Sequence, residues 1–165
     1  MKKTEIELLA ELLKNSKKSD RELGRILGVS QPTVSRTRIK LEKTGVIQEY
    51  TVVPDITKLG FELMAITTGR YIVPRTKELK EKATAYMREF PNILFSSRCQ
   101  GMGKDAVIIS LHENFTDYEN FMANLKTDWA TTVGEQESML ISLKGFVAKP
   151  FSLKYLAEVI NPKKK

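Results

Sequence analysis

Hydrophobic residues recur every three or four positions over the first 45 residues, a spacing typical of short amphipathic helices. The positions expected to face inward are Ile6, Leu9 and Leu13, then Leu23, Ile26 and Leu27, then Val34 and Leu41. Capping boxes at residues 4–7 and 19–22 predict where the first two helices begin. Ser30 is the expected N-cap of a third helix, and Gly45 its left-handed end. The pattern therefore predicts three short helices.

The pattern changes after Gly45. Residues 46–53 are rich in β-branched and aromatic side chains, which predicts a wing or a linking strand. Further along, we expect strand 62–73, helix 77–90, strand 92–100, strand 105–112, helix 117–130 (with a capping box at 116–119) and strand 136–147. This βαββαβ order is that of a ferredoxin-like unit, an antiparallel sheet with both helices on one face. A last amphipathic segment covers residues 152–160.

Residues 20–36 have the spacing of a helix-turn-helix motif. The apolar contacts between its two helices are Leu23, Leu27, Val29 and Val34. Gly24 is the small residue expected where the helices cross, and Gly28 the residue that makes the turn. The alternative is that three helices pack as a small bundle that binds no DNA.

The charge of the chain supports a nucleic-acid partner. The net charge is +7, with 28% charged and 41% hydrophobic residues. Residues 1–60 hold 12 Lys and Arg against 8 Asp and Glu, a net charge of +4. The net +3 of the remainder equals the charge of Lys163, Lys164 and Lys165. The basic excess thus lies in the predicted helix-turn-helix and at the end of the chain, which indicates DNA or another anionic surface.

Several classes of protein are excluded by what the chain contains. No apolar run approaches the roughly 18 residues of a membrane helix, and the charged N-terminus is unlike a secretory signal. A single cysteine, Cys99, and a single histidine, His112, leave no pair for a disulfide and no cluster for zinc. We expect Cys99 to be a buried thiol and His112 to be solvated, and we expect no cofactor and no metal.

The third predicted helix carries the candidate DNA contacts. Advancing about 100° per residue from an inward Val34 places Leu41 inside and the basic residues outside. The candidate DNA-binding residues are Ser30, Gln31, Pro32, Thr33, Ser35, Arg36, Lys40 and Lys43. Small hydroxyls fit the point of entry into a major groove, an arginine can pair with guanine, and lysines suit phosphates. Arg38 falls at an inward position, so either its stem packs on the core or the helix is rotated.

These residues resemble a known family. LGRILGVS (23–30), TVSR (33–36) and LEKTGVI (41–47) are similar to the DNA-binding half of the Lrp/AsnC family. IQEY (47–50) and DITKLG (55–60) resemble its linking strand and the segment that follows. The resemblance implies an α+β fold, an N-terminal winged helix-turn-helix followed by a ferredoxin-like βαββαβ regulatory domain. The expected divisions are residues 1–47, a hinge at 48–60, the regulatory and oligomerisation domain at 61–149, and a C-terminal helix with a basic tail at 150–165.

The resemblance also implies an effector site. Family members usually have a Gly and an Asp two residues apart between the second and third strands of this domain. Here the loop reads Gly-Met-Gly-Lys-Asp, with a different spacing, whereas the turn at residues 132–134 fits better. The candidate effector-binding residues are Gly101, Met102, Gly103, Lys104, Asp105, Thr132 and Gly134. The alternative is that both glycine groups are plain turns.

The predicted function is sequence-specific regulation of transcription, not catalysis. The family resemblance implies a homodimer, with tetramers and octamers as alternatives, that binds pseudo-palindromic double-stranded DNA and responds to an amino acid. A cytoplasmic, nucleoid-associated protein with no membrane contact is expected. One alternative is an architectural protein that coats DNA without sequence preference. Another is a tetrapyrrole decarboxylase, because the sirohaem decarboxylases resemble the family in fold. The single histidine argues against this alternative, because histidines are among the groups expected to handle the tetrapyrrole.

Overall fold

The computed structural model describes residues 1–161, so Lys163 to Lys165 of the predicted basic tail lie outside the described residues. The chain forms two compact units. The first comprises Met1–Pro54 together with the C-terminal segment from Lys149, and the second comprises Asp55–Ala148. In the part that the structure describes, no helix has the length and apolar character needed to cross a membrane.

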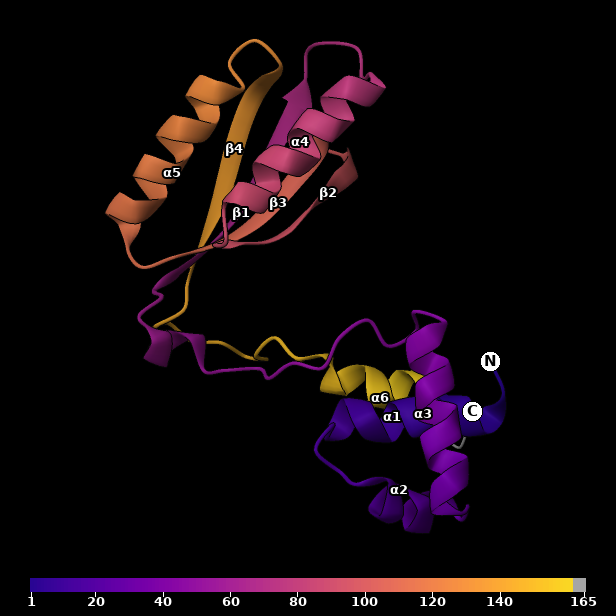
Figure 1. Ribbon diagram of the computed structural model, residues 1–165. Coiled ribbons are helices and arrows are strands. Elements are labelled where there is room, and N and C mark those ends of the chain that lie inside the picture. Colours follow the sequence, from indigo (N-terminus) through magenta and orange to yellow (C-terminus); the bar gives the residue numbers. More distant parts are fainter. Residues whose placement is uncertain (162–165) are drawn as a thin grey trace. The chain divides into compact units, whose positions relative to one another are not determined.

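The first unit is helical (Figure 1). It contains α1 (Lys3–Lys14), α2 (Asp20–Leu27), α3 (Gln31–Lys43), a 3₁₀ turn η2 (Leu153–Tyr155) and α6 (Leu156–Ile160). The core between the first three helices consists of Leu8, Leu12, Leu23, Val34 and Leu41. Since α2 and α3 are joined by a turn of three residues, the predicted helix-turn-helix is confirmed.

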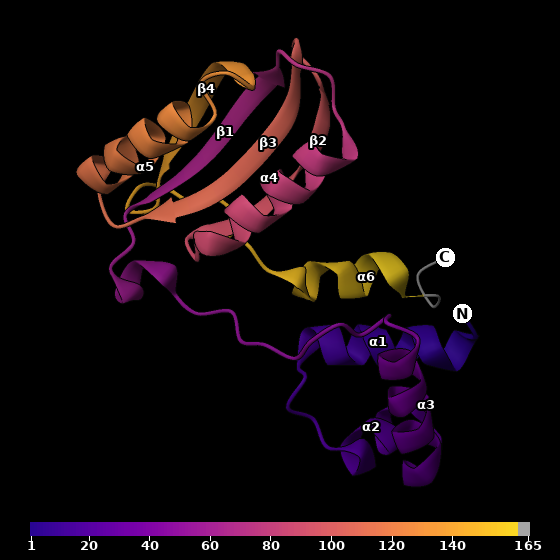
Figure 2. The ribbon, with the colours of Figure 1, turned by 45° about the horizontal axis from the view of Figure 1, so that its top comes forward.

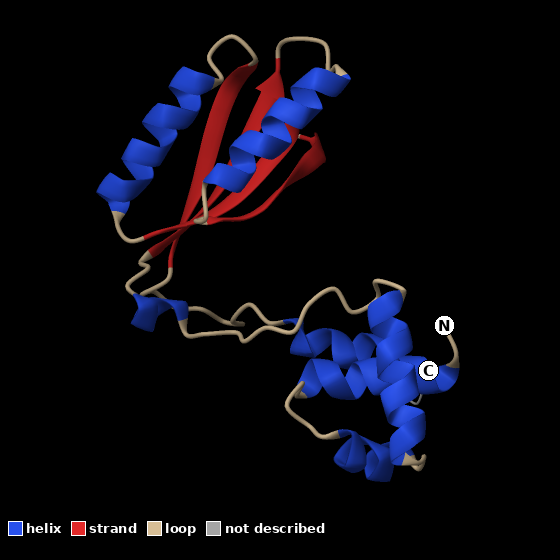
Figure 3. Ribbon diagram, in the orientation of Figure 1, coloured by secondary structure: helices blue, strands red, loops and turns tan. Residues whose placement is uncertain are grey.

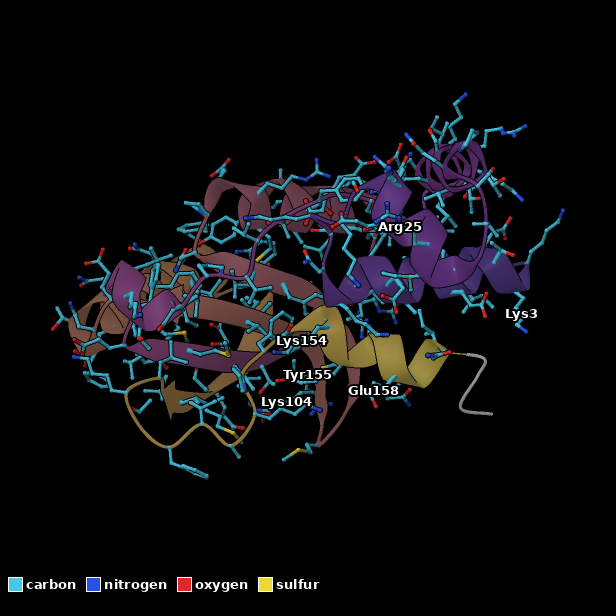
Figure 4. The ribbon with its side chains drawn as sticks, turned by 90° about the horizontal axis from the view of Figure 1, so that it is seen from below. Lys3, Arg25, Lys104, Lys154, Tyr155 and Glu158 are labelled. Atoms are coloured by element: carbon cyan, nitrogen blue, oxygen red, sulfur yellow. The ribbon has the colours of Figure 1, made fainter. Side chains whose placement is uncertain are left out.

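Helix α1 differs from its prediction in two ways. It begins at Lys3 rather than after Thr4, and the Glu5 carboxylate accepts the Lys2 backbone N–H at 2.7 Å. Its fully buried leucines are Leu8 and Leu12, whereas the predicted inward residues Ile6, Leu9 and Leu13 are half-buried. Helix α6 lies along α1 (Figure 4), and its Ala157 is fully buried. Because α1 packs against α2 and α3 and also against α6, its buried residues lie on two sides of the helix. A prediction based on one inward face does not identify them all.

Helix α2 and the turn after it follow the sequence signals closely. Ser19 caps the helix in a reciprocal box with Glu22. A Cβ on Gly24 would stand 2.8 Å from the carbonyl oxygen of Val29, so only glycine permits this approach. Gly28 has φ +68, the left-handed conformation that ends the helix. Ile26 was predicted to face inward but is 48% exposed.

The chain after α3 carries no strand over residues 46–53, so the predicted wing or linking strand is not formed there. Gly45 has φ +70, as expected of the left-handed end of α3. Within the described residues no strand pairs with residues 46–53, and Val52 and Val53 are exposed. β-Branched side chains favour extended backbone, but a strand needs a neighbour to accept and donate its hydrogen bonds.

The second unit begins with a short 3₁₀ turn, η1 (Ile56–Leu59), and has the predicted βαββαβ order (Figure 3). Its elements are β1 (Leu63–Tyr71), α4 (Lys77–Glu89), β2 (Ile93–Gly101), β3 (Lys104–His112), α5 (Phe115–Asp128) and β4 (Val133–Ser142). The sheet is antiparallel with the strand order β2-β3-β1-β4, and both helices cover one face (Figure 2). The expected ferredoxin-like unit is confirmed.

In this unit, one helix and one strand begin at other residues than those predicted. Helix α5 is capped by Asn114, whose side chain accepts the Asp117 backbone N–H at 3.0 Å, and not by Thr116. Strand β4 begins at Val133, three residues before its prediction, and contains an irregularity opposite Thr68 to Arg70. The core under the helices contains Ile108, Phe121, Met122, Leu125 and Trp129.

Candidate DNA-binding and effector sites

The N-terminal end of α3 is exposed and stabilised by its own hydroxyl groups. Ser30 Oγ accepts the Thr33 backbone N–H at 3.3 Å, and the two hydroxyls are 2.8 Å apart. Gln31 and Pro32 of the first turn are exposed. The helix contains one acidic residue, Glu42, in its last turn. A helix N-terminus with no acidic residue in its first turn is an electropositive end that favours a phosphate-rich partner.

Arg36 is exposed one turn further along α3, as predicted. Its Nε donates to the carbonyl oxygen of Pro32 at 3.2 Å, which lays the guanidinium along the first turn of the helix. Thr33 and Ser35 flank it and are half-buried. The remaining guanidinium N–H groups can therefore reach a base edge together with the exposed first turn.

Lys40 and Lys43 are also exposed but differ in their partners. Lys40 Nζ forms an ion pair with Glu5 of α1 at 2.5 Å, and this hydrogen bond is the main reason why the pKa of Glu5 lies below its usual value. The described residues provide no ion pair for Lys43. Sequence reasoning missed the Lys40 contact because Glu5 lies 35 residues away.

Arg38 is part-buried, so α3 is not rotated away from its predicted orientation. Its Nε and Nη2 donate to Asp20 Oδ1 at 2.9 and 2.6 Å, and Nη1 lies 3.4 Å from the Tyr50 hydroxyl. The neighbouring Ile39 is 44% exposed. The helical pattern predicts an apolar residue at this position. The structure has Arg38 there instead, in an ion pair with Asp20 in the first turn of α2.

The predicted effector loop is the tight turn between β2 and β3. Gly101, Met102 and Gly103 have φ values of +145, +51 and +71, and Met102 is 98% exposed. Glycine tolerates such backbone, while a methionine there is unusual. Successive N–H groups in a turn of this kind form a concave site for an anion.

Lys104 and Asp105 fix this turn to the rest of the unit. The Lys104 side chain is 8% exposed; its Nζ donates to the Glu135 carbonyl oxygen at 2.7 Å and lies 3.4 Å from Glu137. Asp105 accepts the Tyr71 backbone N–H at 3.0 Å and the Arg75 guanidinium at 2.7 Å. A carboxylate has about four lone-pair sites, so Asp105 retains two.

The remaining predicted effector residues lie at the same end of the sheet. Thr132 is buried just before β4, and Gly134 borders a small cavity of about 360 Å³. That cavity is also lined by Arg70, Tyr71, Ile72 and Glu135. Since Lys104 contacts Glu135, the structure brings the two predicted effector segments together.

The face of the sheet opposite the helices is not covered by another described element of this unit, and several of its side chains are apolar (Figure 2). The strand register pairs Met64 with Ile141, and Ile66 with both Ile109 and Met139. Phe95 of β2 pairs with Ile109. None of these side chains is fully buried, and Phe95 and Met139 are 52% and 67% exposed.

The single histidine contradicts its prediction. His112 is fully buried, with Nε2 2.8 Å from Ser110 Oγ and Nδ1 3.2 Å from Asp117 Oδ2. Burial lowers the pKa of His112, although Asp117 acts in the opposite direction. Cys99 is half-buried rather than buried. Among the described residues, no cluster of three His, Cys, Asp or Glu could hold a metal ion.

Comparisons with known proteins agree with this geometry. Residues 1–48 match the family model for winged helix-turn-helix DNA-binding. The chain is 31% identical over 129 residues to the transcriptional regulator LrpC of Bacillus subtilis, covering 78% of this chain and 85% of LrpC. It is 34% identical over 121 residues to the regulator Ptr1 of Methanocaldococcus jannaschii, covering 72% of this chain and 77% of Ptr1.

Solved structures have the same fold. The crystal structure of LrpC aligns with a TM-score of 0.72 and 25% identity, over 90% of this chain and 99% of that one. A complex of the Neisseria meningitidis transcriptional regulator NMB0573 with L-Met aligns with a TM-score of 0.75 and 18% identity, over 94% and 99% of the two chains. Given its helix-turn-helix, its ferredoxin-like unit and its sequence similarity to LrpC and Ptr1, the chain belongs to the Lrp/AsnC family of DNA-binding transcriptional regulators, which are not enzymes.

Proposed function

We propose that this regulator binds pseudo-palindromic double-stranded DNA in a sequence-specific manner, as a homodimer or a higher assembly of dimers. The observation that carries the proposal is the exposed N-terminal half of α3, where a hydroxyl-capped end and Arg36 lie together with no acidic residue between them. A single helix-turn-helix offers little contact with DNA. Two copies can occupy half-sites about one helical turn, roughly 34–36 Å, apart.

The residues of α3 divide into two roles in this proposal. Arg36 reads a guanine from the major groove through two hydrogen bonds, while Ser30, Gln31, Pro32, Thr33 and Ser35 form the entering surface. Lys40 and Lys43 lie further along the helix and contact phosphates. The ion pair with Glu5 holds the Lys40 side chain in place before DNA is bound.

The two roles predict different effects of alanine substitutions on DNA binding. Arg36→Ala should cost about 1–3 kcal/mol per half-site and relax the preference at one base position. Lys40→Ala and Lys43→Ala should weaken specific and scrambled DNA alike, and each should reduce the salt slope by about 1. Binding isotherms at several salt concentrations measure both effects, and thermal unfolding of Lys40→Ala separates loss of the Glu5 contact from loss of DNA contact. If Arg36→Ala weakens both DNAs equally, the assigned base reader is wrong.

Footprinting distinguishes this function from DNA coating. A sequence-specific dimer protects discrete sites with half-site periodicity, whereas an architectural protein covers the DNA continuously. Discrete sites are the expected result.

The uncovered face of the sheet supports the proposed homodimer. An apolar sheet face is normally covered by a second layer, and a symmetric dimer covers it with the same face of a second copy. The apolar side chains of this face include Met64, Ile66, Phe95, Ile109, Met139 and Ile141.

We also propose an amino-acid effector at the turn between β2 and β3. The N–H groups of the turn would receive the carboxylate, and Asp105, held by Tyr71 and Arg75, would accept the ammonium with its remaining lone pairs. The complex of the Neisseria regulator with L-Met makes methionine the first candidate. Calorimetry against the twenty amino acids should give at least one signal that is lost in Asp105→Ala. Silence across the set would leave the loop as a plain turn.

A further inference from the structure

Helix α4 packs on the sheet without burying any of its residues, whereas α5 buries Phe121, Met122 and Leu125. The sheet below α4 explains the difference. Three of its helix-facing residues there are small: Gly69, its partner Ala106, and Ser96 of β2. Gly69 also cannot be larger, since a Cβ would stand 2.7 Å from a methyl group of Val133. Small side chains cannot fill the layer between helix and sheet, so space remains.

That space is a cavity of about 670 Å³ inside one protomer, between α4 and the sheet. Its apolar walls include Leu79, Ala83 and Met87 of α4 and Leu125 and Trp129 from the region of α5. The volume is within the range of small-molecule sites, roughly 300–1,000 Å³. The lining residue Ser96 of β2 is exposed, so the cavity is open to solvent there.

Two buried polar atoms, in residues that line this cavity, lack partners. Among the described residues, Trp129 Nε1 and Gln136 Oε1 are the buried side-chain nitrogen and oxygen without a hydrogen bond. Trp129 is 2% exposed, and both residues line the cavity. Buried polar groups in native proteins are nearly always paired, because an unpaired one costs about 1–3 kcal/mol. An unpaired donor and an unpaired acceptor in two residues that line a cavity indicate a binding site in which these groups gain partners.

The charged residues around the cavity have one sign. They are Arg75, Lys80, Arg88 and Arg98, and no Asp or Glu is among the described residues that line it. Asp105 neutralises Arg75 at 2.7 Å, which leaves a positive excess on the side of α4 and β2. An apolar interior with cations at its margin suits an organic anion.

We propose that this cavity binds a small organic carboxylate with an aromatic or aliphatic body, such as an arylalkanoate. The apolar body lies between α4 and the sheet, and the carboxylate lies near Arg98. Because both atoms are buried in the structure, the Trp129 and Gln136 side chains must shift on binding for Nε1 to donate to a ligand oxygen and for Oε1 to accept from a ligand hydroxyl or a bound water. The site belongs to one protomer and lies between α4 and the sheet, not at the turn of residues 101–105, although Tyr71 and Arg75, which hold Asp105, also line it.

The single tryptophan of the chain reports on the site directly. Trp129 fluorescence, supported by calorimetry, should change saturably on titration with 4-phenylbutyrate, phenylpyruvate or octanoate. The amide of 4-phenylbutyrate, which has the same body without charge, should bind about tenfold more weakly. Arg98→Gln should weaken the acid several-fold, and Lys126→Gln, which removes an exposed charge of α5 outside the cavity, should not.

A filling variant tests the location. Ala83→Leu adds volume inside the cavity and should abolish binding while the circular dichroism spectrum stays unchanged. Should that variant unfold, the comparison of Arg98→Gln with Lys126→Gln still decides. Silence from all three acids, equal affinity for acid and amide, or full binding by a folded Ala83→Leu protein would each overturn the proposal.

Discussion

At the scale of single residues, two polar side chains occupy inward positions where an amphipathic pattern predicts apolar residues. Arg38 stands at an inward position of α3, and His112 is fully buried at the end of β3. Each is paired where it is buried: Arg38 with Asp20, and His112 with Ser110 and Asp117. Burial of a polar group is tolerated when its hydrogen bonds are satisfied, which explains why both positions can be polar.

His112 predicts a dependence of stability on pH. Its pKa in the folded protein is below the usual 6.5 because burial disfavours the charged form. The unfolded chain therefore binds the proton first, and the contribution of His112 to stability is present above pH 6.5 and is lost as the pH falls below it. The free energy of unfolding should fall between pH 7.5 and 5, by at most about 1.4 kcal/mol per pH unit from this group.

Urea unfolding followed by Trp129 fluorescence measures this dependence for the second unit. His112→Gln removes the titrating group, so the variant should show a flatter profile whatever its absolute stability. The acidic groups whose pKa is lowered, such as Glu78, titrate below 4.5 and do not act in this window. Parallel profiles for the two proteins would show that His112 is not the source.

At the scale of elements, β4 contains a local irregularity that turns its first residues. Glu135 has φ +48, a left-handed conformation that non-glycine residues rarely adopt, where the pairing with β1 shifts register. Its carbonyl oxygen accepts from the nearly buried Lys104. The bulge thus gives Lys104 a partner and brings the start of β4 to the turn between β2 and β3.

The bulge can be tested with a matched pair of substitutions. Glu135→Gly and Glu137→Gly each remove a carboxylate within 3.5 Å of Lys104 Nζ, but Glu137 has ordinary strand backbone. Glycine relieves the left-handed strain at position 135 and only adds flexibility at position 137. The Glu135→Gly protein should therefore be at least about 1 kcal/mol more stable than the Glu137→Gly protein in urea unfolding. Equal stabilities would argue that residue 135 is not strained.

At the scale of the whole molecule, the uncovered sheet face should determine assembly. Met139 is 67% exposed within a protomer, so Met139→Lys should leave the fold intact. In a homodimer formed through this face, the same change buries a charge against an apolar surface and should produce monomers. Sedimentation velocity at micromolar concentration measures the result, and Ala123→Lys on an exposed position of α5 is the control. A wild-type protein that is already a stable monomer would contradict the proposed dimer.

Local signals in the sequence determined the order of the elements and the family. The helix-turn-helix follows from a few residues close together in the chain: Ser19 with Glu22, Gly24, Gly28 and the Ser30 cap. The βαββαβ order follows from alternation and helical spacing, which depend only on near neighbours. The missing strand at 46–53 marks the limit of this reasoning, since extended propensity does not supply a partner strand.

Tertiary structure alone decided which residues of distant segments meet. Helix α6 covers a second side of α1, Glu5 pairs with Lys40, and Lys104 reaches Glu135. The cavity below α4 likewise arises where small residues of different strands come to lie side by side, such as Gly69 and Ala106. No spacing along the chain encodes these contacts, because they depend on strand register and on the packing of elements far apart in sequence.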